Sequence, residues 1–167
     1  MTTPTEIGRN EAQIEAADRS LVEATTSIIS TVCKIQPTVN AQWTEANLPG
    51  EKVIAVVSFV GDLDVNIFLG LPSATAVVLA SKFAGFEIPF ESSDMADAVG
   101  ELTNMVAGDL KIRLDRCRMK ANISVPTVFR GQDLIVATPR SEVVRQHCFH
   151  TGGGDFMAGL CSKKPTQ

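Results

Sequence analysis

Apolar residues recur at intervals of three and four in three parts of the chain, and each part predicts a helix. Residues 10–35 predict a long first helix that ends before Pro37, with the apolar positions Ile14, Ala17, Leu21, Ile28, Val32 and Ile35. A second helix is predicted over 72–84, because Pro72 suits a first helical position and Gly85 suits the residue after the last turn. The third helix is predicted over 94–115.

Runs of Val, Ile and Phe between these helices predict strands. The strongest runs are 52–60 and 63–69, which Gly61-Asp62 joins as a tight hairpin. Weaker runs predict a strand at 39–46 (with Trp43), which the Pro49-Gly50 turn follows, and strands at 121–128, 134–137, 143–149 and 156–161, with a break at 130–133. The glycines at 152–154 read as a hairpin turn, because no lysine or helix follows them as in a phosphate-binding loop. This order of helices and strands predicts an α+β domain.

The third helix carries two different faces. One face is apolar and predicts docking on a core, with Met95, Ala98, Val99, Leu102, Met105 and Val106. The opposite face forms a polar stripe, here called the signature stripe, of Asp97, Glu101, Asn104, Gly108 and Lys111. We expect Asp94 to cap this helix and Asp97 to favour the positive end of its dipole from the first turn. A solvated polar face alone is one interpretation of the stripe.

Gly108 is the unusual member of the stripe. A glycine inside a helix costs about 1 kcal/mol relative to alanine, so its presence calls for a reason. Close approach of another protein's surface is one such reason. A carboxylate and a carboxamide held three residues apart on a helix, as in Glu101 and Asn104, are also well suited to positioning chemistry.

Composition and charge narrow the class of protein. The chain has 167 residues, of which 44% are hydrophobic and 20% charged, as expected for one globular domain. A net charge of −4 without a basic stripe argues against nucleic acid as a partner. The apolar runs are much shorter than the roughly 20 residues that span a bilayer, and the polar N-terminus lacks a signal peptide's apolar segment. We therefore expect a cytoplasmic protein with no membrane partner.

Cysteine and histidine patterns give no support for metal or nucleophilic chemistry. Four cysteines (Cys33, Cys117, Cys148 and Cys161) lack CxxC spacing, so we expect reduced and partly buried thiols. His147 and His150 lie close in sequence, but strand alternation places them on opposite faces. The chain has only two histidines, both late in one predicted strand, so the sequence shows no evident Ser/His/Asp catalytic triad. We expect no metal or cofactor on this chain.

The stretch 100–111, GELTNMVAGDLK, resembles the signature helix of the CheX/CheC/FliY family of chemotaxis phosphatases. That signature has an acidic or serine position, three residues, Glu, two residues and Asn, with a proline some twenty residues later; Asp97, Glu101, Asn104 and Pro126 match it. The resemblance extends over about 21–161 and is closest to the single-domain CheX branch. It implies one domain over 20–163, preceded by a polar segment, 1–19, that can extend the first helix.

The resemblance also implies a fold and a function. The fold is a CheC-like α+β arrangement of two helix-then-strands half-repeats, 20–69 and 94–161, with long helices packed on an antiparallel sheet. The function is hydrolysis of the aspartyl phosphate on a CheY-like receiver that holds its own Mg²⁺. Asn104 orients the attacking water, Glu101 pairs with the receiver lysine, and Asp97, Gly108 and Lys111 contact the partner.

Two alternatives and two further expectations accompany this interpretation. A protein of the same fold could bind a receiver without hydrolysing its phosphate, or could use the helix face as a dimer interface. CheX-like proteins resemble strand-exchanged homodimers, so we expect a homodimer joined through sheet edges with the signature stripes outward.

In the first half-repeat Glu23 and Thr26 stand where Glu101 and Asn104 stand in the second. A threonine hydroxyl often bonds its own helix, so we predict one active site per chain.

Overall fold

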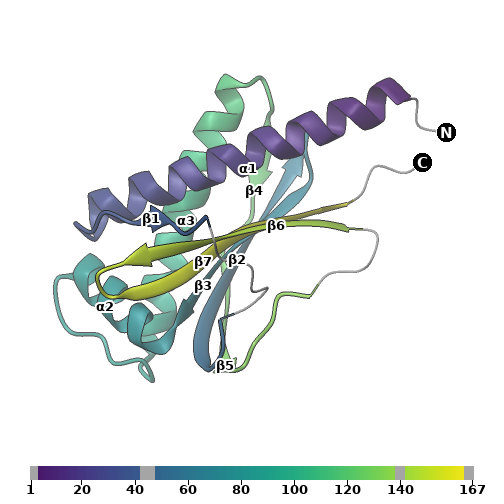
Figure 1. Cartoon of the computed structure of the whole chain (residues 1–167). Coiled ribbons are helices and arrows are strands. Elements are labelled where there is room, and N and C mark those ends of the chain that lie inside the picture. The colour runs from purple at the N-terminus through teal and green to yellow at the C-terminus, as the bar shows by residue number, and fades with distance from the viewer. Residues whose placement is uncertain (1–3, 42–47, 138–141, 164–167) are drawn as a thin grey trace.

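The computed structural model describes residues 4–41, 48–137 and 142–163, which form three helices and one sheet (Figure 1). In chain order the elements are α1 (Pro4–Val32), β1 (Thr38–Val39), β2 (Glu51–Gly61), β3 (Val65–Pro72), α2 (Ser73–Ala84), α3 (Ser93–Arg116), β4 (Ala121–Ile123), β5 (Thr127–Gln132), β6 (Glu142–Thr151) and β7 (Gly154–Lys163). None of the helices in these ranges has the length and apolar character that a bilayer crossing needs. The predicted α+β class is confirmed.

The sheet has seven strands and all its pairings are antiparallel. Its order is β1-β6-β7-β3-β2-β4, and β5 pairs with β2 beside β4 on the same edge. The hairpins β2–β3 and β6–β7 meet at the centre, where β3 pairs with β7. Each half-repeat therefore supplies one hairpin.

The short strand that follows each long helix pairs with the hairpin of the other half. Thr38 and Val39 of β1 pair with the end of β6, and Ala121–Ile123 of β4 pairs with the end of β2. The two halves thus exchange their short strands across the sheet. Each half therefore contributes one strand to the hydrogen bonding of the other half.

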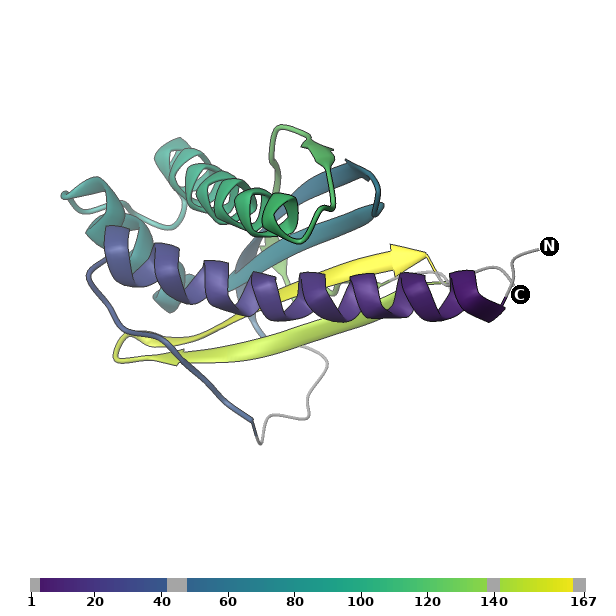
Figure 2. The ribbon, with the colours of Figure 1, turned by 90° about the horizontal axis from the view of Figure 1, so that it is seen from above.

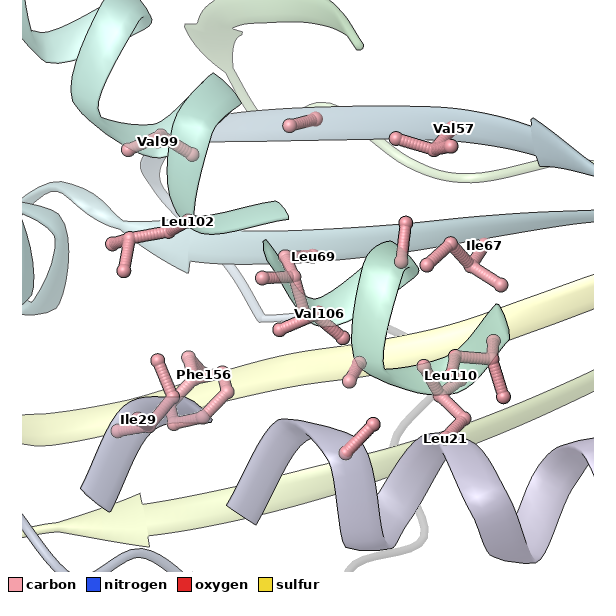
Figure 3. Close-up of a cluster of buried hydrophobic side chains, with 14 of the residues drawn as sticks. Leu21, Ile29, Val57, Ile67, Leu69, Val99, Leu102, Val106, Leu110 and Phe156 are labelled. Atoms are coloured by element: carbon pink, nitrogen blue, oxygen red, sulfur yellow. The ribbon is translucent and has the colours of Figure 1, made fainter. Parts of the chain in front are cut away.

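All three helices cover one face of the sheet (Figures 1 and 2). The main core lies between α1, α3 and the sheet (Figure 3), and its fully buried side chains include Leu21, Ile29, Val57, Ile67, Leu69, Val99, Leu102, Val106, Leu110 and Phe156. The rings of Phe149 and Phe156 stack with their centroids 5.0 Å apart beneath α1. Burial of these side chains fixes both helices on the sheet, and it therefore determines which face of α3 is exposed.

The other face of the sheet carries a smaller apolar cluster. Ile54, Phe68 and Cys161 are buried there, and Leu134 and Val136 pack against them. The predicted strand over 134–137 is wrong, because this segment lies on the sheet's face instead of pairing at its edge. Alternating apolar residues fit either arrangement, so the sequence pattern could not distinguish them.

Several predicted boundaries also differ. The predicted strand over 121–128 is two strands separated by 124–126, and the predicted break at 130–133 falls mostly inside β5. The β2–β3 turn is wider than a two-residue hairpin, since Phe59 and Val65 form the last pair. Pro72 precedes α2 instead of opening it, while Gly85 ends it with φ 80°. Of the predicted strand over 39–46, β1 includes Val39, whereas residues 42–46, and Trp43 with them, lie outside the described residues.

The remaining element predictions hold. The glycines at 152–154 form the β6–β7 turn, where Gly154 has φ 124°. The first helix extends further toward the N-terminus than the apolar pattern alone, from Pro4, and ends at Val32, five residues before Pro37. These helices and hairpins leave one long side of α3 exposed at the surface of the protein.

Candidate functional site

The site is built on α3, a 24-residue helix that begins at Ser93. Ser92 occupies the N-cap position without a capping side-chain bond, and its hydroxyl donates instead to the carbonyl of Pro89 at 2.7 Å. The prediction that Asp94 caps the helix is therefore wrong. Asp94 lies in the first turn, where its charge favours the helix dipole, and Asp97 lies one turn later than predicted.

The inner face of α3 is the apolar face that the sequence predicts. Met95, Ala98, Val99, Leu102 and Val106 are buried, whereas Met105 is only half-buried. The buried face also includes Gly100 and Thr103, which the apolar pattern missed. Thr103 is accommodated because its hydroxyl donates to the carbonyl of Val99 at 2.8 Å.

The outer face of α3 carries the whole signature stripe. Asp97 and Glu101 are exposed, and Asn104, Gly108 and Lys111 are half-buried. Residues three apart on a helix have Cβ atoms about 5–6 Å from each other, so Glu101 and Asn104 can engage one small group together.

Among the described residues, the side chains of Glu101 and Asn104 make no hydrogen bond or ion pair with any other residue. Lys111 differs, since its ammonium group lies 4.0 Å from the carboxylate of Asp115. Such a half-exposed i,i+4 pair contributes only a few tenths of a kcal/mol. Glu101 and Asn104 are therefore available to a molecule that docks on the helix.

The two glycines of α3 have different surroundings. A Cβ on Gly100 would lie 3.4 Å from Cγ2 of Val128 and 4.0 Å from Cβ of Pro126, so this glycine packs against the β4–β5 connection. A Cβ on Gly108 would meet nothing within 4 Å. Packing inside the chain therefore gives no reason for glycine at 108.

Residues 120–126 border the signature stripe along most of the stripe's length. At one end Pro126 packs near Gly100, and at the other Lys120 and Asn122 share a hollow of about 660 Å³ with Lys111 and Asp115. The segment from 120 to 126 consequently runs beside α3 in the opposite direction. Pro126, which matches the proline of the signature, lies beside the same helix as Glu101 and Asn104.

An ion network fixes α3 against α1. The guanidinium of Arg113 donates to Asp109 at 2.8 Å on its own helix and to Glu23 of α1 at 2.5 Å. The hydrogen bond that Arg113 donates to Asp109 is the main reason that the pKa of Arg113 is raised. The sequence analysis missed this network; the i,i+4 spacing of Asp109 and Arg113 is the signal that could have revealed half of it.

The thiols of Cys33, Cys148 and Cys161 are buried, Cys117 is exposed, and both imidazoles lie beside carboxylates. Burial raises the pKa of Cys33 and of Cys148 to about 11, which disfavours their reactive thiolates at neutral pH. His147 lies 2.8 Å from Asp18 of α1, and His150 lies 2.6 Å from Asp155 across the hairpin. Across 4–41, 48–137 and 142–163 no three metal-binding side chains gather.

The arrangement supports one kind of chemistry better than others. A carboxylate and a carboxamide stand side by side on a rigid helix that faces outward. The carboxamide offers both a donor and an acceptor and cannot ionise, so it can orient a water molecule at any physiological pH. The site can complete a reactive centre that another protein brings to it.

The chain is similar to known chemotaxis proteins in sequence and in fold. The family model described as "Chemotaxis phosphatase CheX" matches residues 53–149, which include the signature stripe. The chain is 30% identical over 83 residues to the CheY-P phosphatase CheX of Thermotoga maritima, and this match spans 49% of the chain and 54% of that protein. The chain thus covers about half the length of this curated relative.

Solved structures extend the likeness to nearly the whole chain. A chemotaxis protein CheX from Desulfovibrio desulfuricans is 28% identical with a TM-score of 0.77, covering 90% of this chain and all of that one. The CheX of a CheX–CheY–BeF₃–Mg²⁺ complex from Borrelia burgdorferi is 17% identical with a TM-score of 0.68, covering 88% of this chain and 97% of that one. CheC-like proteins share the fold as well, which confirms the predicted CheC-like architecture.

Proposed function

The chain belongs to the CheX family, and on this premise we propose that it hydrolyses the aspartyl phosphate of a CheY-like receiver domain. The proposal rests on one observation: Glu101 and Asn104 lie side by side on the outer face of α3, and neither has a side-chain partner among the described residues. A purely structural helix would not need this pair. The proposal is also supported by the name of the Thermotoga maritima relative, which is a CheY-P phosphatase.

Asn104 orients the attacking water in this proposal. Its side-chain oxygen accepts a hydrogen bond from the water, and its NH₂ group faces a phosphoryl oxygen. An acyl phosphate is already reactive, so correct placement of water in line with the phosphorus provides most of the acceleration that remains to be gained. The helix holds the carboxamide in place, because the inner face of the same turn is anchored by Leu102 and Val106.

Glu101 fixes the docking position of the receiver. One turn away from the carboxamide, its carboxylate pairs with the receiver's active-site lysine. Asp97, Gly108 and Lys111 extend the contact along the same face, with Gly108 allowing the closest approach. The receiver supplies the Mg²⁺, and this chain supplies no cofactor. We propose that the reaction takes place in the cytoplasm.

The test is a phosphate-release assay with a panel of purified CheY-like receivers from the source genome, each phosphorylated and mixed with a tenfold smaller amount of this protein. We expect many turnovers per molecule with at least one receiver. Binding without any acceleration would instead identify a non-catalytic receiver-binding module of the same fold. A receiver that already dephosphorylates rapidly alone serves as the background control.

We also propose that the protein forms a homodimer through sheet edges. Within the described ranges, β1 pairs with only the last residues of the ten-residue strand β6, at Phe149 and His150. An incompletely paired edge strand favours association with a second copy. Sedimentation at several concentrations would measure the dimer, and receiver binding by the dimer would exclude an interface that buries the signature stripe.

A further inference from the structure

Val125 is the most exposed large apolar side chain in the described part of the protein, at 82%. It lies between β4 and β5, immediately before Pro126. Single exposed apolar residues are common on protein surfaces and carry no meaning alone. The backbone around Val125, however, gives its exposure a specific cause.

The cause is a β-bulge. Ile123 pairs with Phe59 and Thr127 pairs with Val56, so four steps on one strand oppose three steps on β2. One extra residue is therefore inserted opposite Val57, at Val125 and Pro126. A bulge of this kind turns a side chain away from the regular alternation, and bulges are frequent next to active sites.

Both neighbours of Val125 are held in place. Ser124 donates its backbone N–H to the carbonyl of Ser58 at 2.9 Å and accepts the N–H of Ser58 on its hydroxyl at 3.0 Å. Pro126 packs near Gly100 of α3. The exposed valine is thus presented on a fixed backbone, which reduces the entropy that a partner must remove on binding.

The bulge lies inside the area that a protein would cover if its interface were of standard size and centred on Asn104. Gly100 is one helical turn from Asn104, and its position near Pro126 places Val125 within about 15 Å of Asn104. A standard interface covers about 800 Å² on each partner, which corresponds to a disc of about 16 Å radius.

We infer that Val125 is a docking contact for the phosphorylated receiver, supplying apolar affinity beside the polar pair Glu101 and Asn104. The inference rests on the proposed function for the identity of the partner. In this inference α3 carries the groups that act on the phosphoryl centre, whereas the bulge carries a contact that affects only the affinity for the receiver. Val125 is not a catalytic residue.

The experiment compares Val125→Ser with a matched control, Ile135→Ser, in the full chain. Ile135 is 66% exposed and lies in the segment that packs on the opposite face of the sheet. Binding is measured to the receiver that the wild-type protein dephosphorylates, charged with Mg²⁺ and beryllofluoride, and KM and kcat are measured with the phosphorylated form. A melting curve of each variant confirms that it is folded.

We expect Val125→Ser to raise Kd and KM about tenfold, equivalent to about 1.4 kcal/mol, with kcat unchanged. Ile135→Ser and the conservative Val125→Ile should stay within twofold of wild type. Binding by Val125→Ser within twofold of wild type overturns the inference, as does equal weakening by Ile135→Ser or a fall in kcat alone.

The outcomes also separate this inference from the proposed function. If Asn104→Ala abolishes turnover while Val125→Ser binds normally, only the role of Val125 fails. If a beryllofluoride-charged receiver binds and Val125→Ser weakens it, but the wild-type protein never accelerates hydrolysis, the catalytic proposal fails and the docking contact stands. A wild-type protein that binds no receiver overturns both.

Discussion

The two long helices carry similar polar pairs that have different surroundings. On α1, Glu23 is bound by Arg113 of α3, and the hydroxyl of Thr26 donates to the carbonyl of Val22 at 2.9 Å. On α3, Glu101 and Asn104 have no such partners among the described residues. Both helices bury their opposite faces in the same core, as Leu21 and Val99 do.

The difference indicates how a surface helix becomes a site. In α1 both polar groups are satisfied within the chain, so they stabilise the helix pair and offer little to a partner. In α3 the helix is equally well anchored, but its polar groups remain available. Tertiary packing supplies rigidity to both helices, and only the second combines rigidity with exposed, unsatisfied chemistry. The following four variants test this comparison.

Asn104→Ala should have the largest effect. Loss of a positioned catalytic amide lowers the rate by about 100-fold or more, whereas a surface helix substitution changes stability by only about 0.5 kcal/mol. The measurement is receiver dephosphorylation at saturating receiver, together with a thermal melt. Asn122→Ala, an exposed amide on β4, is the control and should keep kcat within twofold. An Asn104→Ala protein that retains half the wild-type rate contradicts the assignment.

Glu101→Gln should weaken binding of the beryllofluoride-charged receiver about tenfold, because a charge-assisted pair with the receiver lysine becomes a neutral hydrogen bond. The salt dependence of binding should also decrease, since the lost interaction is the screened one. Titration at two salt concentrations measures both effects. Glu87→Gln changes the net charge equally at an exposed position away from the stripe and should bind as wild type does. Unchanged affinity and rate in Glu101→Gln would remove its proposed role.

Gly108→Ala should raise stability and weaken receiver binding at the same time. The added methyl group meets nothing within 4 Å inside the chain, so helix propensity favours it by up to about 1 kcal/mol. A receiver that approaches the helix backbone closely would meet that methyl group and bind several-fold more weakly. Gly8→Ala on α1 also adds a methyl in open space and serves as the control for stability alone. Unaltered binding by Gly108→Ala would leave its glycine unexplained.

The double substitution Glu23→Ala with Thr26→Ala should leave the dephosphorylation rate unchanged. It removes the exposed half of the Arg113 network, and Glu23 is 63% exposed, so we expect a loss of less than about 1 kcal/mol in unfolding free energy. Chemical denaturation and the turnover assay provide the two measurements. A clear fall in rate in a folded protein would mean that α1 contributes chemistry.

Much of the fold follows from local patterns that the sequence displays. The inner face of α3 and the end of α2 at Gly85 were predictable, because helical periodicity and a left-handed terminal glycine are local signals. The signature stripe was also predictable as a face, since the spacing of Asp97, Glu101 and Asn104 determines their alignment once the helix is known.

The parts that were not predictable depend on distant residues. The ion pair of Arg113 with Glu23 joins positions 90 apart in sequence. The bulge at Val125 exists only relative to the register of β2, and the placement of Leu134 and Val136 on the sheet's face depends on Ile54 and Phe68. Local periodicity contains no information on such partners.

The outward, open position of the signature stripe has a practical consequence for enzyme screening. Chromogenic phosphate esters report on enzymes that enclose a small molecule and provide all of its binding groups. Here Glu101 and Asn104 project from a convex helix, and the proposed reaction depends on a metal, a lysine and an acyl phosphate that belong to another protein. A survey with such dyes would therefore class this chain as inactive, and its activity would become visible only when an intact signalling protein is the reagent.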